Sequence, residues 1–367
     1  METFRLFDLF FVLLGAVFVG ILLYLLWGQA RSTSKRSVAL EKLTILIPFK
    51  NEANRLPGLI RCLSEALISK PHFNVKLLND HSTDLSAQFI ADLELTDQIL
   101  LHHAGEKAFG KKAVLTETII EISDLWVLIM DADTELPKYF FDHLEKVISD
   151  GDKSILIPIS PIKRKGLVPA FFDLDFLSLH FAGLKSAALG RPLLANGACM
   201  LINRDAYVES MPFRNDWNEQ SGDDVFAMFA IARRFGRKSI SVSTLSNPLV
   251  LVSFPSAFRK LWRQRLRWIA KSGKIDNTWF KFVAISVLTI QISLIIAALL
   301  ITQGYFSVIG IAMFFVVLII EILFLAIATT KLNRKDLWIY IVPSVFIYPF
   351  YLLTLGIFST FAKPKWK

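Results

Sequence analysis

Three long apolar runs without a charged residue stand out along the chain, and a stretch of mixed polar and apolar residues separates the first run from the second. The runs cover residues 9–27, 282–320 and 337–362. Because a helix of about 20 apolar residues crosses the hydrocarbon core of a bilayer, each run is long enough to span a membrane. The pattern therefore predicts an integral membrane protein.

The first run predicts a transmembrane anchor within an N-terminal segment, residues 1–30. A cleaved signal peptide is the alternative. However, Glu2 and Asp8 reduce the positive charge that such a peptide carries at its start, and no small-x-small cleavage site follows Trp27. We therefore expect this helix to be retained.

The two later runs predict a group of transmembrane helices in residues 278–362. The second run is far longer than one helix needs, and Gln303-Gly304 provides a break near its middle, which predicts a two-helix hairpin. In the third run Pro343 and Pro349 would kink the helix or make part of it re-entrant. The expected total is four spans, and complete crossing by the last one stays open.

The middle of the chain, residues 40–275, alternates short apolar runs with longer amphipathic ones. Such alternation predicts an α/β domain with a mostly parallel sheet and helices on both faces. In such a sheet ligands bind beyond the carboxyl ends of the strands. The expected strands are 43–48, 75–78, 125–130 and 154–159, and the expected helices lie near 55–69, 83–95, 111–122 and 137–149.

The basic residues predict the side of the membrane on which this domain lies. Lys and Arg follow the first span and separate the third from the fourth, so both flanks are expected in the cytoplasm, at the plasma membrane if the source is a bacterium. The residues concerned are Arg31, Lys35, Arg36, Lys42, Lys331, Arg334 and Lys335. The terminal KPKWK conflicts with this arrangement, because four complete spans would place it outside.

Composition narrows the class of protein further. With 53% hydrophobic residues and a mean hydropathy of +0.48, the chain is too apolar to be wholly soluble. Its formal net charge of +9 would suit nucleic acid, but no zinc-finger, RNP or helix-turn-helix pattern accompanies it, so we expect no nucleic-acid partner. Cys62 and Cys199 form no CxxC pair, so neither a disulfide framework nor a thiolate metal site is indicated.

Polar and acidic segments follow three of the predicted strands, namely PFKNEAN, NDHSTD and DADTELP. Each of them alone is also typical of an ordinary turn. The DxD pair Asp131 and Asp133 follows a strand, whereas a second match, Asp173 and Asp175, does not. That second pair lies in FFDLDFLSLHFAGL (171–184), which is either an interfacial helix that guides an acceptor or a buried helix of the middle domain.

Two carboxylates on a strand-end turn suit a hard divalent cation, Mg²⁺ or Mn²⁺, whose remaining ligands often include substrate phosphates. No GxxxxGK[ST] or GxGxxG motif follows a strand, which argues against a P-loop and a dinucleotide-binding site. The segment FGKKAVL places Gly110, Lys111 and Lys112 at a predicted helix start. There they would meet an anion or form a solvated basic turn.

Taken in order, the segments IPFKNE, LLNDHSTD, GKKAVL, LIMDADT, NGACMLINRDAY, GDDVF and RQRLRW resemble the successive motifs of family 2 glycosyltransferases with a GT-A fold. The resemblance spans residues 43–270. The last segment is similar to the Q/R-x-x-R-W signature of membrane-embedded members, such as cellulose, chitin and hyaluronan synthases and ceramide glucosyltransferases.

The resemblance implies a role for each carboxylate. Asp80 would bind the uracil of a UDP-sugar, and Asp131 with Asp133 would contact the ribose and the metal on the diphosphate. Asp224 would be the catalytic base. The further substrate contacts implied are Pro48, Asn51, Glu52, Lys111, Lys112, Asp223, Gln264, Arg267 and Trp268.

Three positions depart from the family pattern. The usual Thr-Glu-Asp at the base reads Gly222-Asp223-Asp224 after Ser221, so the choice of Asp224 rests on register. The usual double Asp at the uracil site reads Asn79-Asp80, and the usual Asn after "AL" is Thr116. None of these changes removes a carboxylate that the reaction needs.

Two segments of the resemblance also have an ordinary structural interpretation. The segment VFAMFAIARRFG predicts an amphipathic helix, so we expect one aspartate of the preceding pair to cap it and the other to act. On a helix Gln264, Arg267 and Trp268 share one face, which suits a diphosphate with a sugar ring beside it. The neighbouring Arg263, Arg265, Lys271 and Lys274 are expected to hold the helix against lipid phosphates.

The function expected from these residues is inverting sugar transfer. The cation and Arg267 would stabilise the leaving diphosphate, and Asp224 would take the proton of the acceptor hydroxyl. A single base on the face opposite the leaving group inverts the anomeric centre. The acceptor is expected to be a membrane lipid. A processive polysaccharide synthase that extends a growing glycan is the alternative, and an inactive nucleotide-binding or scaffold protein is the alternative from another class.

Overall fold

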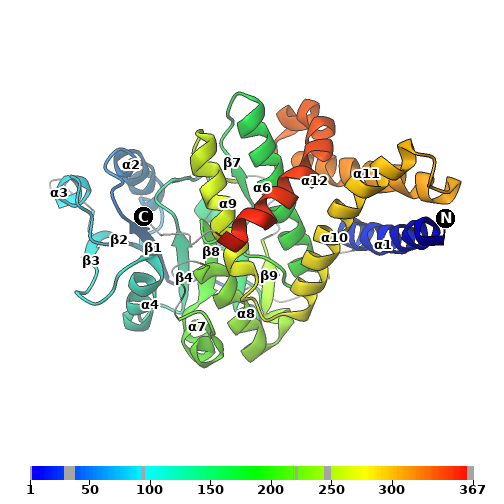
Figure 1. Ribbon diagram of the computed structural model, residues 1–367. Helices are drawn as coiled ribbons and strands as arrows, with labels where there is room; N and C mark the ends of the chain where they lie inside the picture. Colours follow the sequence, from blue (N-terminus) through cyan, green and yellow to red (C-terminus); the bar gives the residue numbers. More distant parts are fainter. Residues whose placement is uncertain are drawn as a thin grey trace.

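The computed structural model describes residues 2–28, 38–91, 96–217, 219, 222–243 and 249–361 of the 367-residue chain. Within these ranges it contains a sheet domain and a group of long apolar helices (Figure 1). The basic residues expected at 31–36 and the terminal KPKWK lie outside the described residues.

The main sheet has seven strands in the order β3-β2-β1-β4-β8-β6-β9. Four neighbouring strands, β3, β2, β1 and β4, are parallel, while β8 is antiparallel to both of its neighbours. The strands are β1 (Leu43–Phe49), β2 (Phe73–Asn79), β3 (Ile99–His103), β4 (Trp126–Met130), β6 (Ser154–Leu156), β8 (Cys199–Asn203) and β9 (Ile240–Val242). A mostly parallel α/β sheet is therefore confirmed.

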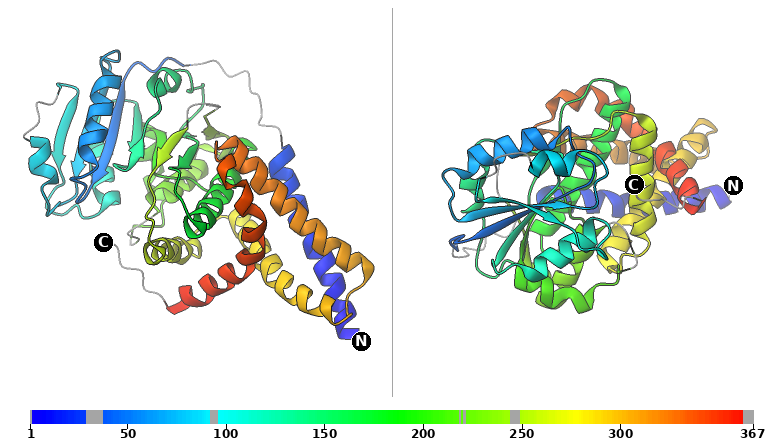
Figure 2. Two further views of the ribbon diagram at one scale, coloured as in Figure 1. Left: turned by 90° about the horizontal axis from the view of Figure 1, so that it is seen from above. Right: turned by 90° about the vertical axis from the view of Figure 1, so that its left-hand side faces the viewer.

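Helices cover both faces of the parallel part (Figure 2). The strands β1 and β4 are buried along their whole length, as expected for a sheet covered on both sides. The covering and connecting helices are α2 (Leu56–Leu67), α3 (Ser86–Ala91), α4 (Lys111–Glu121), α5 (Phe140–Leu144), α7 (Arg204–Ser210) and α8 (Asp223–Phe235).

A second, three-stranded sheet has the order β5-β10-β7. It consists of β5 (Thr134–Glu135), β7 (Ile159–Pro161) and β10 (Val250–Val252). The strand expected at 154–159 is therefore divided between two sheets, because β6 ends at Leu156 and β7 begins at Ile159. The helix expected at 137–149 is limited to the five residues of α5.

In the part of the chain that the structure describes, five helices are long and apolar enough to cross a membrane. They are α1 (Glu2–Trp27), α6 (Leu167–Ala188), α10 (Thr278–Thr302), α11 (Val308–Lys331) and α12 (Trp338–Phe361). The N-terminal helix, the hairpin α10–α11 broken at Gln303-Gly304, and the final helix match the four long apolar helices expected from the three runs. The fifth, α6, is the segment that contains the second DxD pair.

The helix α6 joins the sheet domain to the long helices. It contacts β7 and β9 on one side and α1, α11 and α12 on the other. Two of its aspartates are buried in ion pairs: Asp173 with Arg164 and Arg334, and Asp175 with Arg265. Of the two interpretations of this segment, the buried helix is the one the structure supports.

Candidate active site

A cavity of about 1800 Å³ lies where the parallel strands end and continues between the long helices. At one end it is lined by carboxylates from the ends of β2 and β4 and from the start of α8. At the other end its walls come from α1, α10, α11 and α12, with residues such as Leu22, Val287 and Phe324. The polar end therefore opens into an apolar compartment.

The turn after β4 carries the first DxD pair. The backbone N–H of Asp131 donates to Ala198 O at 3.0 Å, and the Thr134 hydroxyl donates to Asp131 O at 2.7 Å, so two contacts fix the turn. Burial and the adjacent Asp131 carboxylate raise the pKa of Asp133 to about 7. The turn therefore places two carboxylates at the cavity wall, where the negative charge of Asp131 disfavours ionisation of Asp133.

Lys111 lies at the centre of the acidic cluster. Its Nζ is 2.5 Å from Asp131 Oδ1, 3.2 Å from Gly197 O and 4.0 Å from Asp223 Oδ2. Burial alone would lower the pKa of this ammonium, but the carboxylates of Asp131 and Asp223 outweigh burial and raise it. Lys111 therefore stays charged and partly neutralises the cluster.

The ends of β1 and β2 supply the next part of the wall. Pro48, Asn51 and Glu52 line the cavity together with Asp80. Asn51 has a positive φ of 58°, and its Oδ1 accepts the N–H of Thr83 at 2.8 Å, so the loop after β1 is held to the loop after β2. The Asp80 side chain is 5% exposed, and its Oδ1 accepts the N–H of Gly110 at 3.0 Å.

Asp223 and Asp224 form the first turn of α8, and both line the cavity. The N-cap is Gly222, with φ 92°, so the expectation that one of the two aspartates caps the helix was wrong. Asp224 Oδ2 accepts the N–H of Gly197 at 2.8 Å, and its Oδ1 accepts the N–H of Val225 at 2.8 Å. The Asp224 carboxylate is thereby fixed in orientation.

Asp223 differs from its neighbour in its surroundings. Burial raises the pKa of its carboxyl; the charge of Lys111 opposes this, and the carboxylates of Asp224 and Asp131 add to it. The cation that pairs with it is Lys111, whose Nζ lies 4.0 Å from Asp223 Oδ2.

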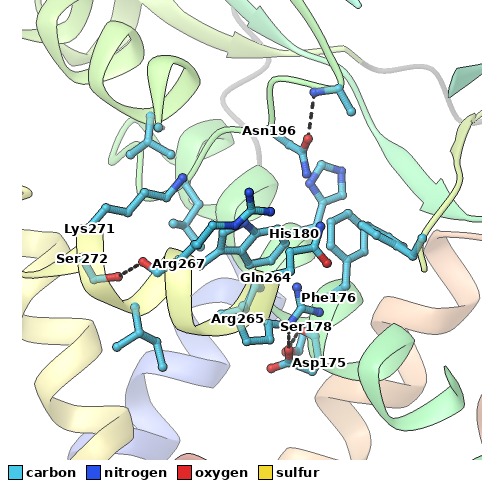
Figure 3. A pocket seen from close by; sticks show the side chains of 18 of the residues that line it. Asp175, Phe176, Ser178, His180, Asn196, Gln264, Arg265, Arg267, Lys271 and Ser272 are labelled. Atoms are coloured by element: carbon cyan, nitrogen blue, oxygen red, sulfur yellow. Dashed lines mark hydrogen bonds and ion pairs between the residues drawn. The ribbon is translucent and has the colours of Figure 1, made fainter. Parts of the chain in front are cut away.

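Helix α9 (Phe258–Ser272) brings Gln264, Arg267 and Trp268 to the cavity, as their spacing predicts. Gln264 and Arg267 are seen in Figure 3. Gln264 Oε1 is buried without a hydrogen-bond partner among the described residues. Burial lowers the pKa of Arg267. An amide oxygen and a guanidinium thus lie at the cavity wall beside an indole ring.

The expected contact of Arg265 with lipid phosphates was wrong. Arg265 is 4% exposed and points inward: its Nε is 2.5 Å from Asp175 Oδ2, and its guanidinium lies 4.2 Å from the centre of the Trp268 ring (Figure 3). Asp175 of the second DxD pair therefore positions α9, the helix that carries Gln264, against α6. Nothing in its pattern distinguished this role, because the partner arginine is 90 residues away in the sequence.

One predicted residue is not brought to the cavity. The Lys112 ammonium lies against the backbone oxygens of Asp216 and Glu219 instead. Every other predicted site residue lines the cavity. The sequence assigned no individual role to three further lining residues, Arg55, His180 and Gly197, and Lys271, expected at lipid phosphates, also lines the cavity.

The residues present fit a divalent cation bound with a diphosphate. Asp131 and Asp133 offer oxygen ligands at the cavity wall. Burial and the Asp131 carboxylate raise the pKa of Asp133, and a bound cation would stabilise its ionised form. Among the described residues no group of three or more His, Cys, Asp or Glu side chains is arranged around one metal position. A cation here would need substrate phosphates to complete its ligands.

Comparison with known proteins supports the same class of enzyme. Residues 126–356, more than half of the chain, match the family model described as glycosyl transferase family group 2. A search of curated proteins finds no significant match.

Among solved structures, the mannosyltransferase PcManGT from Pyrobaculum calidifontis, determined with GDP-Man and Mn²⁺, has a TM-score of 0.55 at 15% identity, covering 94% of this chain and 99% of that one. Residues 1–349 of S. aureus TarS give a TM-score of 0.44 at 14% identity, covering 83% and 90%. The first likeness is one of fold, and it agrees with the GT-A architecture expected from the motifs.

Proposed function

Since this chain belongs to glycosyl transferase family group 2, we propose that it moves a hexosyl or N-acetylhexosaminyl group from a UDP-sugar to a hydroxyl of a membrane lipid, with inversion at the anomeric carbon. The catalytic domain would comprise residues 40–275, between an N-terminal anchor at 1–30 and the helices at 278–362. It would lie on the cytoplasmic face.

The observation that carries the proposal is the continuity of the cavity. It begins at Asp131 and Asp224 and ends among side chains of α1, α10, α11 and α12. A lipid with its hydroxyl at the carboxylates would place its hydrocarbon chain in the apolar part. Transfer of apolar surface out of water contributes about 25 cal/mol per Å², so such a compartment favours an acyl or prenyl chain over a free sugar.

The length of the cavity favours single transfer over polymer export. On α10 its lining residues run from Phe280 to Gln291, and on α11 from Glu321 to Leu325, so they occupy the half of each helix nearer the sheet domain. A compartment that ends about halfway along the hairpin suits a lipid chain. A polymer channel would have to continue to the far ends of these helices.

The chain's own residues account for acceptor activation. Asp224 would accept the proton of the lipid hydroxyl as its oxygen attacks the anomeric carbon and the bond to the diphosphate oxygen breaks. The N–H groups of Gly197 and Val225 hold this carboxylate in one orientation. Attack from the side opposite the leaving diphosphate gives inversion.

The leaving diphosphate needs positive charge on the other side of the sugar. A Mg²⁺ or Mn²⁺ held by Asp131 and Asp133 would supply most of that stabilisation. Arg267 can add a bidentate contact to phosphate oxygens, and Lys111 keeps the carboxylate cluster from repelling the diphosphate. Asp80, with Pro48, Asn51 and Glu52, would hold the nucleoside.

The test uses the purified full chain in lipid nanodiscs with a panel of UDP-sugars, and GDP-mannose as a comparison donor. Asp224→Asn should lower kcat by about a hundredfold to ten-thousandfold, the usual contribution of a general base. Asp205→Asn is the matched control, because Asp205 is exposed on α7 and pairs only with Arg204 at 2.8 Å.

The products distinguish the three functions. A lipid that gains one sugar mass, with an inverted anomeric centre by NMR, supports the proposal. A ladder of repeating sugar masses would replace it with a processive synthase. Nucleotide binding without any transfer would indicate a binding or scaffold protein, and unchanged activity of Asp224→Asn would refute the base assignment.

A further inference from the structure

The deep end of the cavity contains a polar pair that the reaction does not use. Gln291 of α10 and Glu321 of α11 line this end, next to Ser344 and Tyr348 of α12. Gln291 Nε2 donates to Glu321 Oε1 at 2.5 Å. Polar side chains inside a membrane protein are costly, so a pair that faces a cavity calls for an explanation.

The pair lies well away from the ends of α10 and α11 that are nearer the sheet domain. Gln291 comes thirteen residues after Thr278, where α10 begins, and Glu321 comes ten residues before Lys331, where α11 ends. At about 1.5 Å of rise per residue, these separations correspond to roughly 20 Å and 15 Å of helix. The pair therefore lies near the middle of both helices, where the surroundings are hydrocarbon.

One atom of the pair has no partner. Gln291 is 2% exposed, and its Oε1 is buried without a hydrogen bond among the described residues. The contact between the two side chains uses the amide Nε2, so holding α10 against α11 does not account for the amide oxygen. A buried acceptor without a donor is unfavourable, and a ligand that brings a donor removes that cost.

We propose that Gln291 Oε1, supported by Glu321, recognises a hydrogen-bond donor in the apolar part of the acceptor lipid. The inference rests on the proposed lipid acceptor and adds its chemical class: a lipid with a hydroxyl or amide N–H along its hydrocarbon portion, in addition to the hydroxyl that is glycosylated. A lipid with unsubstituted chains fills the same space but leaves the amide oxygen unpaired.

The experiment is native mass spectrometry of the purified full chain in detergent, with an equimolar mixture of two diacylglycerols. One carries a hydroxyl at the middle of an acyl chain, and the other is identical without it. We expect wild type to retain the hydroxylated lipid with a preference of about tenfold, as one additional hydrogen bond to a buried acceptor gives.

Two substitutions locate the preference. Gln291→Leu removes the acceptor at similar volume, and Glu321→Gln supplies an amide that can donate to Gln291 Oε1 within the protein, so each should bring the ratio close to one. Thr289→Val is the matched control, because Thr289 is half-buried two residues away on α10, is not among the residues that line the cavity, and its hydroxyl donates to Ile285 O. It should keep the wild-type ratio.

Binding is measured without turnover, so the outcomes separate the two proposals. Equal binding of both lipids by wild type, or a preference that survives in Gln291→Leu and in Glu321→Gln, would overturn the inference while sugar transfer to lipid could still stand. Lipid binding with the expected preference but no sugar transfer to either lipid would instead count against the proposed function. A merely structural role of the pair would lower stability in both variants without changing the ratio.

Discussion

At the scale of single residues, the contact between Gly197 and the proposed base leaves little room for a side chain. A Cβ added at Gly197 would lie 3.2 Å from Asp224 Cβ and 3.3 Å from Lys111 Nζ, closer than most such contacts. Gly197 precedes β8, and its N–H also orients Asp224. A displacement here moves two catalytic groups together.

We therefore expect Gly197→Ala to lower kcat at least tenfold, since a misplacement of about 1 Å in catalytic geometry can cost about a hundredfold. Gly58→Ala is the control: it lies in α2, its added Cβ meets nothing within 4 Å, and its φ is not positive. Initial rates of sugar transfer by both purified variants measure the effect. Equal rates would mean that the loop before β8 does not hold the base.

The protonation of Asp133 gives a second prediction at this scale. Its pKa is raised from 3.8 to about 7, first by burial and then by Asp131. The folded chain thus holds this proton more tightly than the unfolded chain. Ionising Asp133 therefore destabilises the fold as pH rises from about 4, and the cost is fully present above about pH 7.

With a chelator present, the thermal midpoint of wild type should fall relative to Asp133→Asn between about pH 5 and pH 8. Added Mn²⁺ should restore wild type at the higher pH and leave Asp133→Asn unchanged, because the cation takes over the neutralising role of the proton. Differential scanning fluorimetry measures the thermal midpoints of wild type and Asp133→Asn, with the chelator and with Mn²⁺. A midpoint difference that stays constant with pH would contradict the shifted carboxyl.

At the scale of elements, a buried ion network locks α6 to the rest of the protein. Asp173 is 0% exposed and lies between Arg164 and Arg334, and the Arg334 guanidinium also donates to Pro161 O in β7 at 3.0 Å. One aspartate thus joins α6 to the segment between α11 and α12.

Replacing Asp173 by Ala should cost about 3–5 kcal/mol of stability, since it leaves buried guanidinium charge without a partner. Asp205→Ala, which breaks an exposed pair on α7, should cost at most about 1 kcal/mol. Thermal unfolding of both variants in the same detergent makes the comparison. Similar midpoints would show that water or lipid compensates the arginines.

What could be predicted at this scale depended on local patterns. Short apolar runs between turns predict the buried strands β1 and β4 and the first halves of the βα units. The strand β3 (ILLHH) ends in two histidines, and β8 pairs antiparallel between β4 and β6, an arrangement that no local run encodes. The buried state of α6 depends on arginines distant in sequence, so periodicity alone left it open.

At the scale of the whole molecule, the long helices differ in direction. α1, α10 and α11 extend together away from the sheet domain, and Phe11 and Phe306 meet at their far end with ring centres 5.6 Å apart (Figure 2). α12 begins beside Arg334, which contacts β7, and near its other end Phe358 lies 6.1 Å from Trp262 of α9. Both ends of α12 therefore contact the domain side.

This geometry predicts that α12 returns to the cytoplasmic face, whereas the turn between α10 and α11 is external. In a Cys62→Ser background, with Cys199 left in place because it is buried, we expect Gln303→Cys to react with a membrane-impermeant maleimide added to intact cells. Thr360→Cys and, in the sheet domain, Glu121→Cys should react only after permeabilisation. All three positions are exposed, so access to the reagent depends on the side of the membrane. Labelling of Thr360→Cys in intact cells would mean that α12 crosses the membrane completely. The lipid compartment would then be formed by four full spans, and not by three spans and a helix that returns to the cytoplasmic face.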